Sequence, residues 1–128
     1  MTESRRADLR GAVAMSEDFW RALDELVSTS RLVIDRPRDS AHPRYPDFTY
    51  PLDYGYLADT TAADGDGIDV WLGSLPERRV TGVISTVDLH KRDAELKLLL
   101  GCTPAEAHIA LATHQSGSQA AILQWRSA

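Results

Sequence analysis

The chain has 128 residues, of which 43% are hydrophobic and 26% are charged, and this composition is typical of a single globular domain. Its formal net charge is −5 and its arginines are scattered along the chain, which argues against the basic surface of a nucleic-acid-binding protein. Cys102 is the only cysteine, so the fold cannot depend on an internal disulfide.

The N-terminal segment is rich in charged residues and alanine and carries no clear helix cap. We therefore expect residues 1–15 to form a flexible or loosely helical lead, followed by a single domain over residues 16–128. The first six residues, Met1–Arg6, are polar and charged, which predicts neither a signal peptide nor a membrane-spanning helix. Together with the lone cysteine, this favours a cytoplasmic protein with no membrane partner.

An amphipathic helix is predicted to begin at Ser16, whose hydroxyl can cap the first turn. Its apolar residues recur at helical spacing and would share one face: Phe19, Trp20, Leu23, Leu26 and Val27. We interpret this face as part of the core. A docking face for another subunit is the alternative, because the same pattern serves both purposes.

Short apolar runs bounded by Gly, Pro, Asp or Ser predict a series of strands along the rest of the chain. These runs are Arg31–Asp35, Tyr54–Leu57, Ile68–Leu72, Val80–Val87, Ala94–Leu100 and Gln119–Trp125. Prolines at positions 37, 43, 46 and 51 exclude a helix between the first two runs and predict a loop or an extended edge there.

A second helix is predicted after Thr103, which can cap the helix while Pro104 occupies its first turn and Glu106 completes a capping box. This helix should end near Gln115 or Ser116. Strands without regularly interleaved helices favour a small antiparallel barrel or a curved sheet. We therefore predict an α+β fold that is mostly β, with a helix at each end of the chain.

The segment Asp64-Gly-Asp-Gly-Ile-Asp69 places three carboxylates within six residues. At about 4 Å, two like charges repel by roughly 4 kcal/mol at an effective dielectric constant near 20, so close carboxylates either share protons or bind cations. Oxygen ligands favour the hard cations magnesium, manganese and calcium. The alternative is an acidic surface turn in which the glycines adopt positive φ angles.

The strand that follows this segment favours the cation site, because it places Asp69 on a rigid element. Alternation along the strand sends Asp69 and Trp71 to one face of the sheet and Val70 to the other. An EF-hand calcium loop is excluded by spacing, since Ile68 and Leu75 would occupy positions that require oxygen ligands.

Further polar motifs accompany this segment. Asp88 and Asp93 flank a predicted turn between two strands, where the alternative is an ordinary polar hairpin loop. The segment Tyr50-Pro-Leu-Asp-Tyr-Gly-Tyr56 precedes both acidic groups. The four histidines have no zinc-ligand spacing with Cys102, and no phosphate-binding glycine loop or serine-hydrolase motif occurs.

In this combination and order, the motifs resemble those of the soluble family I inorganic pyrophosphatases, from about Leu32 to about Gly101. The resemblance is carried by Val33-Ile-Asp-Arg-Pro37, Tyr50–Tyr56, Asp64–Asp69, and Asp88 with Asp93. It implies a small, five-stranded, OB-like barrel and hydrolysis of pyrophosphate to two phosphates with Mg²⁺, or with Mn²⁺ in its place. By analogy with the family, it also implies a homo-oligomer.

The resemblance further implies roles for individual residues. The metal ligands would be Asp64, Asp66, Asp69, Asp88 and Asp93. Asp66 would also activate the attacking water, and Tyr54 would line the site as a catalytic residue. Arg44, Lys97 and Tyr54 would hold the substrate. Asp35 stands where the family usually has a glutamate and would support the site from behind the ligands.

The chain departs from the family in the cations that hold phosphate. Glu95 stands where the family has a lysine two residues after Asp93, and Lys97 follows two residues later. The family's C-terminal tyrosine and lysine pair is absent from the segment Gln115–Ser118. Two alternatives therefore stay open: a metal-dependent hydrolase of another phosphoanhydride or a phosphate ester, and a catalytically weak metal-binding or interaction module.

Overall fold

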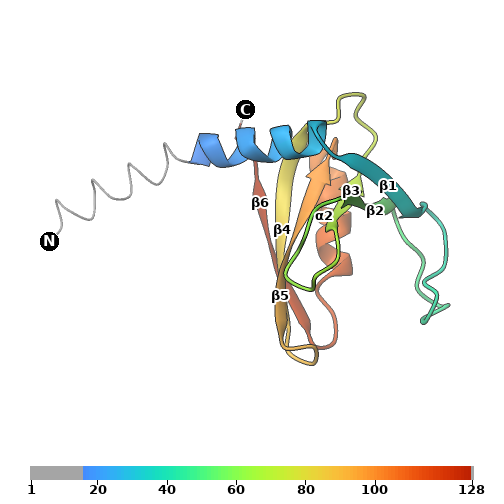
Figure 1. Cartoon of the computed structure of the whole chain (residues 1–128). Coiled ribbons are helices and arrows are strands. Elements are labelled where there is room, and N and C mark those ends of the chain that lie inside the picture. The colour runs from blue at the N-terminus through green and yellow to red at the C-terminus, as the bar shows by residue number, and fades with distance from the viewer. Residues whose placement is uncertain (1–15, 128) are drawn as a thin grey trace, which may run out of the picture.

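The computed structural model describes residues 16–127 (Figure 1). The expected lead over residues 1–15 lies outside the described residues. Six strands form one sheet: β1 (Arg31–Arg36), β2 (Asp53–Ala58), β3 (Ile68–Leu72), β4 (Val80–Asp88), β5 (Asp93–Leu100) and β6 (Gln119–Trp125). Each strand matches its predicted range to within one residue at either end.

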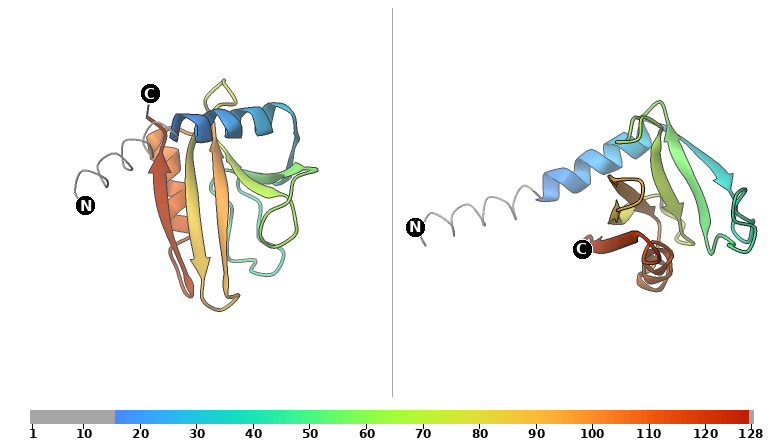
Figure 2. Two further views of the ribbon diagram at one scale, coloured as in Figure 1. Left: turned by 60° about the vertical axis from the view of Figure 1, so that its left-hand side comes forward. Right: turned by 90° about the horizontal axis from the view of Figure 1, so that it is seen from below.

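The strand order across the sheet is β1-β2-β3-β5-β4-β6, so β1 and β6 lie at the two edges. All neighbouring strands are antiparallel except β3 and β5, which run parallel. Seen end-on, the sheet is strongly curved but its edges do not meet (Figure 2). The predicted α+β, mostly β class is confirmed, whereas the predicted barrel fits only loosely, because the sheet is not closed. The sheet also has six strands rather than the five expected.

Each face of the sheet has its own hydrophobic cluster. Trp71 and Leu99 lie in the cluster that includes residues of the C-terminal helix, and Val70 and Leu98 lie in the cluster that includes residues of the N-terminal helix. The predicted alternation of Trp71 and Val70 between the two faces is therefore confirmed. Because Asp69 is two residues before Trp71, it belongs to the same face as Trp71.

The N-terminal helix covers residues 16–28 of the described chain and crosses one end of the sheet (Figures 1 and 2). Its inward residues pack against the cluster that contains Val70: Trp20, Leu23, Leu26 and Val27. Phe19 is 43% exposed, so its expected place in the core is wrong. Asp24 fixes the helix to the sheet by accepting hydrogen bonds from the Val80 amide, at 3.1 Å, and the Arg126 guanidinium, at 2.7 Å.

The C-terminal helix α2 spans Pro104–Thr113 and lies against β6 (Figure 1). The predicted capping box is confirmed, because the Thr103 side chain accepts from the Glu106 amide while the Glu106 side chain accepts from the Thr103 amide. The helix ends earlier than predicted, with His114 as its C-cap. Within residues 16–127, no helix combines the length and apolar character needed to cross a bilayer.

Candidate functional site

Strand register brings three of the predicted site residues together on the α2 face of the sheet. Tyr54 is paired with Trp71 across β2 and β3. The parallel pairing of β3 with β5 joins Val70 to Leu98, which places Asp69 beside Lys97 on the opposite face from that pair. Tyr54, Asp69 and Lys97 therefore converge although they are far apart in the sequence.

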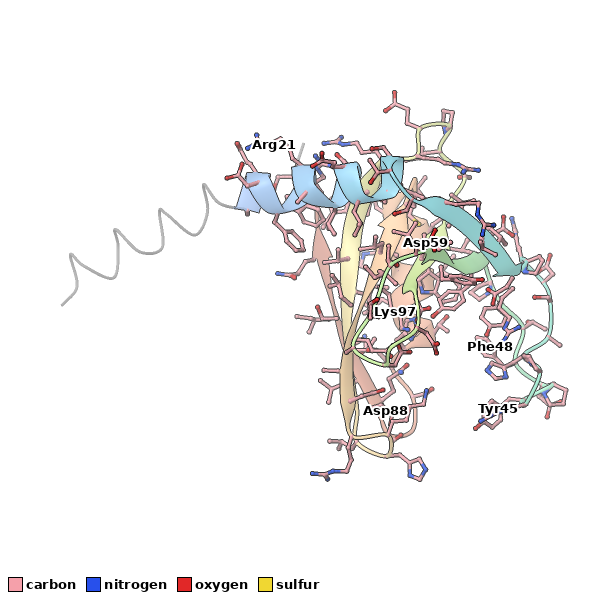
Figure 3. The ribbon with its side chains drawn as sticks, viewed as in Figure 1. Arg21, Tyr45, Phe48, Asp59, Asp88 and Lys97 are labelled. Atoms are coloured by element: carbon pink, nitrogen blue, oxygen red, sulfur yellow. The ribbon has the colours of Figure 1, made fainter. Side chains whose placement is uncertain are left out.

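The Lys97 ammonium is the centre of this group. Its Nζ atom donates to Asp69 Oδ2 at 2.8 Å, to Glu95 Oε2 at 3.1 Å and to the Tyr54 hydroxyl oxygen at 3.1 Å. Lys97, which is labelled in Figure 3, is buried, and its exposed fraction is only 5%. We call Lys97, Asp69, Glu95 and Tyr54 the Lys97 cluster. Because an ammonium group has three N–H donors, these contacts use all of them.

The electrostatics of the cluster keep Lys97 charged and Tyr54 neutral. Burial alone would lower the pKa of Lys97, but the Tyr54 oxygen and the Asp69 carboxylate outweigh it and hold this pKa above its ordinary value. Burial raises the pKa of Tyr54, with the Lys97 ammonium acting against the shift. Tyr54 therefore keeps its proton at neutral pH and can donate a hydrogen bond but cannot act as a base.

Glu95 connects the Lys97 cluster with the acidic segment at residues 64–69. Burial raises the pKa of Glu95, while the Lys97 ammonium lowers it and a hydrogen bond with the Asp64 side chain raises it again. Two carboxyl groups in contact are favourable only if they share a proton or a cation. Through this contact between Asp64 and Glu95, the predicted acidic turn reaches strand β5 of the sheet.

The acidic segment itself forms a tight surface turn. The Asp64 carboxylate accepts from the Asp66 amide at 3.0 Å, and the Ala62 amide donates to the Asp66 carbonyl at 2.7 Å. Gly65 has a φ angle of 87°, which favours glycine. At Gly67, a Cβ would lie 2.7 Å from the Leu57 carbonyl oxygen, so the turn packs closely on β2. Asp64 and Asp66 are both exposed.

Asp88 and Asp93 face each other as the last pair of the β4–β5 hairpin. One oxygen of Asp88, Oδ1, accepts from the His90 amide at 2.9 Å, the Lys91 amide at 3.1 Å and the Ser118 hydroxyl at 2.9 Å. The Lys91 amide and the Ser118 hydroxyl are the main causes that lower the pKa of Asp88. Figure 3 shows Asp88 near the tip of the hairpin.

The Lys97 cluster and the pair Asp88 and Asp93 lie at different places along the β4–β5 hairpin. Lys97 is paired with Ile84, four residues along β5 from the pair Asp88 and Asp93. At about 3.3 Å per residue, this spacing corresponds to about 13 Å. Within residues 16–127, no three His, Cys, Asp or Glu side chains approach closely enough to bind one metal ion. The oxygen donors suit Mg²⁺ in kind, but the arrangement described here does not fit a bound metal ion.

The remaining predicted site residues lie apart from the Lys97 cluster. Arg44 is an exposed residue of the loop between β1 and β2, where its amide donates to His42 Nδ1 at 3.0 Å. Asp35 is exposed at the irregularity between Ile34 and Arg36 in edge strand β1. In the described part of the chain, neither side chain has a recorded contact with the cluster.

Sequence reasoning missed two polar residues on the α2 face. Glu95 was noted only as the replacement of a lysine, although its spacing of two residues from Lys97 places both on one face of β5. His114 accepts from the Trp71 indole at 3.0 Å and contacts Gln119 Oε1 at 2.9 Å. Burial is the main cause that lowers the pKa of His114 to about 4.

The Lys97 cluster is continuous with an aromatic array. Tyr54 lies 4.5 Å from Trp71 and 5.5 Å from Tyr50 between ring centroids. Tyr50 in turn contacts Phe48 at 5.1 Å and His42 at 6.1 Å, in the loop that also carries exposed Tyr45 (Figure 3). The Tyr54 ring thus packs against Trp71 and Tyr50, and these contacts help to fix the position of its phenol.

No family model matches the chain. Two curated proteins are 37% identical to it over 60 residues: the inorganic pyrophosphatases of Geobacillus stearothermophilus and of Bacillus sp. strain PS3. Each match covers 41% of this chain and 36% of the relative, so the similarity spans little more than a third of the relatives' length.

Solved structures extend the similarity from sequence to fold. The chain resembles the inorganic pyrophosphatase of Helicobacter pylori with a TM-score of 0.51 and 14% identity, over 73% of this chain and 81% of that one. An inorganic phosphatase of Anaplasma phagocytophilum gives a TM-score of 0.50 and 18% identity over the same shares of the two chains. The chain thus resembles inorganic pyrophosphatases in part of its sequence and in its fold.

Proposed function

We propose that the chain hydrolyses inorganic pyrophosphate to two phosphates, with the magnesium complex of pyrophosphate as its substrate. The observation that carries the proposal is the 37% identity to two proteins named inorganic pyrophosphatase. The similarity of the fold, and the gathering of Tyr54, Asp69 and Glu95 on one face of the sheet, support it.

The charge of the site explains why the substrate would be a metal complex. The acidic turn and the Lys97 cluster together carry four carboxyl groups, Asp64, Asp66, Asp69 and Glu95, against the single ammonium of Lys97. Free pyrophosphate is a polyanion and would be repelled by this surface. Mg²⁺ bound to pyrophosphate weakens this repulsion, because it neutralises part of the charge of the anion and presents a cation to the exposed aspartates. Mn²⁺ would serve in the same way.

Asp66 is the proposed general base. It is exposed on a turn whose backbone is held by hydrogen bonds from Ala62 and to Asp64, so its carboxylate can reach solvent while its position stays defined. A carboxylate accepts a proton from a water molecule in such a position and orients it for attack on phosphorus. Tyr54 keeps its phenol proton, and it would donate a hydrogen bond to phosphate in exchange for its hydrogen bond with the Asp69 side chain.

The test is release of phosphate from pyrophosphate, measured with and without Mg²⁺, by the parent protein and by Asp66→Asn. We expect metal-dependent release by the parent and a loss of about 10²-fold or more in the variant. Asp59→Asn is the matched control, because Asp59 is also exposed but lies outside the acidic segment. No release by a protein with a folded circular-dichroism spectrum would refute the proposed activity.

A second candidate function is favoured by the Lys97 cluster itself. All three N–H donors of Lys97 bind side chains of the protein, and within residues 16–127 the hydrogen bonds and ion pairs of the cluster involve no second lysine or arginine. A pyrophosphatase-like module that binds ligands with little turnover would fit this arrangement. Calorimetric binding of magnesium pyrophosphate without phosphate release would favour this candidate over the enzyme.

A metal-dependent hydrolase of another phosphoanhydride or a phosphate ester is the third candidate. A panel of nucleotides and phosphate esters in the same assay separates it from a pyrophosphatase.

Self-association and a cytoplasmic location are expectations that accompany the proposal. Light scattering on the purified chain measures the first directly, since a monomer has a mass of 14.1 kDa.

A further inference from the structure

The Lys97 ammonium is held in the manner of a small cation with oxygen ligands. Its contacts come from three side chains on three strands: Tyr54 on β2, Asp69 on β3 and Glu95 on the same strand β5 as Lys97. All three partner atoms are oxygens, at 2.8–3.1 Å from Nζ. Two of the three partners, Asp69 and Glu95, are carboxylates, which are the ligands that a hard metal ion prefers.

Burial explains why the position needs a positive charge. The side chains of Lys97, Asp69 and Glu95 are 6%, 27% and 14% exposed, respectively, so both carboxylates have lost most of their contact with water. Without the ammonium, two acidic groups would face each other in a largely dry place, at a considerable electrostatic cost. A divalent cation would meet the same requirement with the same oxygens.

The geometry excludes the role of Lys97 as a direct phosphate ligand in this arrangement. Its three N–H donors already have protein acceptors, and no buried side-chain polar atom of the described residues lacks a partner. A phosphate oxygen would have to displace Asp69 or Glu95 to reach Nζ. The Lys97 ammonium therefore neutralises the Asp69 and Glu95 carboxylates of the protein itself.

We infer that the Lys97 ammonium is a built-in replacement for a metal ion, which occupies the cation position between Asp69 and Glu95 and prevents a divalent ion from binding there. Removing the ammonium while keeping the two carboxylates should convert the position into a site for a divalent ion. The inference concerns the site of the proposed function but does not require turnover, because it is tested by binding alone.

The test is binding of Mn²⁺, without pyrophosphate, to the parent chain and to Lys97→Met, followed by electron paramagnetic resonance and calorimetry. We expect Lys97→Met to gain one site with an affinity at least about tenfold higher than any site of the parent. Lys91→Met is the matched control, because it removes the same charge from an exposed position at the hairpin turn. The double variant Lys97→Met with Glu95→Gln should lose the gained site.

Equal binding of Mn²⁺ by a folded Lys97→Met variant and by Lys91→Met would overturn the inference. If Lys97→Met does not fold without metal, the parent chain still provides a test by nuclear magnetic resonance. Bound Mn²⁺ broadens the signals of nearby nuclei most strongly, so we expect the Leu98 and Val70 amide signals of the parent to broaden less than the amide signals of Asp64 and Asp66 when Mn²⁺ is added. Selective broadening of these signals would place the metal beside Lys97 and contradict the inference. Activity assays on the same proteins test the proposed hydrolysis separately.

Discussion

The α2 face has two acidic ends: the Lys97 cluster, which we call the inner end, and the hairpin tip with Asp88, which we call the outer end. The carboxylates of the two ends are neutralised in different ways. In the Lys97 cluster, Asp69 and Glu95 are compensated by a buried ammonium. At the hairpin tip, Asp88 is compensated by two backbone amides and the Ser118 hydroxyl, which carry no net charge. Both regions look alike as acidic sequence motifs. The difference teaches that the charge near a carboxylate, and not the carboxylate alone, decides whether a place is open to a cation.

The largest expected effect comes from removing the inner ammonium. Lys97→Met should lower the free energy of unfolding by about 3 kcal/mol, the lower end for a broken buried ion pair, because it leaves the partly buried Asp69 and Glu95 without their partner. Urea denaturation followed by tryptophan fluorescence measures this loss, and saturating Mn²⁺ should restore part of it. A loss below that of Lys91→Met would show that the inner ammonium does not stabilise the fold.

Acid should destabilise the inner end of the face through His114. The pKa of His114 falls from 6.5 to about 4 on folding, so the unfolded chain binds more protons between these values and stability decreases as the pH falls from about 6.5 to about 4. At about 1.4 kcal/mol per pH unit, the effect reaches roughly 3 kcal/mol. Denaturation midpoints of the parent and His114→Gln across this range measure it. Parallel pH profiles for the two proteins would contradict the assignment.

A smaller loss of stability is expected when Asp69, one of the two carboxylates of the Lys97 cluster, is made neutral. Asp69→Asn keeps an oxygen acceptor for Lys97, and Glu95 still supplies a negative charge, so we expect a loss of about 1.5 kcal/mol, the lower end for a hydrogen bond to a charged group. Denaturation at neutral pH measures it. A loss as large as that of Lys97→Met would mean that Asp69 alone, and not the cluster, carries the compensation.

The smallest effect is expected at the hairpin tip. Asn in place of Asp88 can still accept from the His90 and Lys91 amides, which are the contacts that hold the turn. The charge contribution of Asp88 is fully present above its ordinary pKa of 3.8 and is lost as the pH falls through its lowered folded value. Denaturation of Asp88→Asn at pH 7 should give a smaller loss than Asp69→Asn. A larger loss of stability for Asp88→Asn than for Asp69→Asn would show that the charge matters more at the hairpin tip than in the Lys97 cluster.

Much of the fold could be predicted because its signals are local. Short apolar runs bounded by Gly, Pro, Asp or Ser located all six strands, and the spacing of Thr103 and Glu106 predicted the capping box of α2. Phe19 was misplaced because helical spacing does not say how far the inward face extends around the helix. The end of α2 at Thr113 was missed because no local signal distinguishes His114, its C-cap, from a helical residue; in the fold His114 contacts Trp71.

The site was predictable only in part, because its geometry depends on register. Alternation correctly placed Asp69 on the same face as Trp71, but the neighbour of Asp69 is set by the parallel pairing of β3 with β5. Nothing local to Lys97 predicts that its donors turn inward. The distance between the inner and outer acidic groups likewise follows from the length of the β4–β5 hairpin.

Whether the Lys97 ammonium takes the place of a metal ion is tested most directly by a crystal structure of the parent chain. The crystals would be grown with Mn²⁺ and pyrophosphate, and the metal would be located by its anomalous scattering. We predict no anomalous peak between Asp69 and Glu95, and an intact Lys97 ammonium in contact with both carboxylates. A manganese peak bound by Asp69 and Glu95, with Lys97 displaced, would contradict the account.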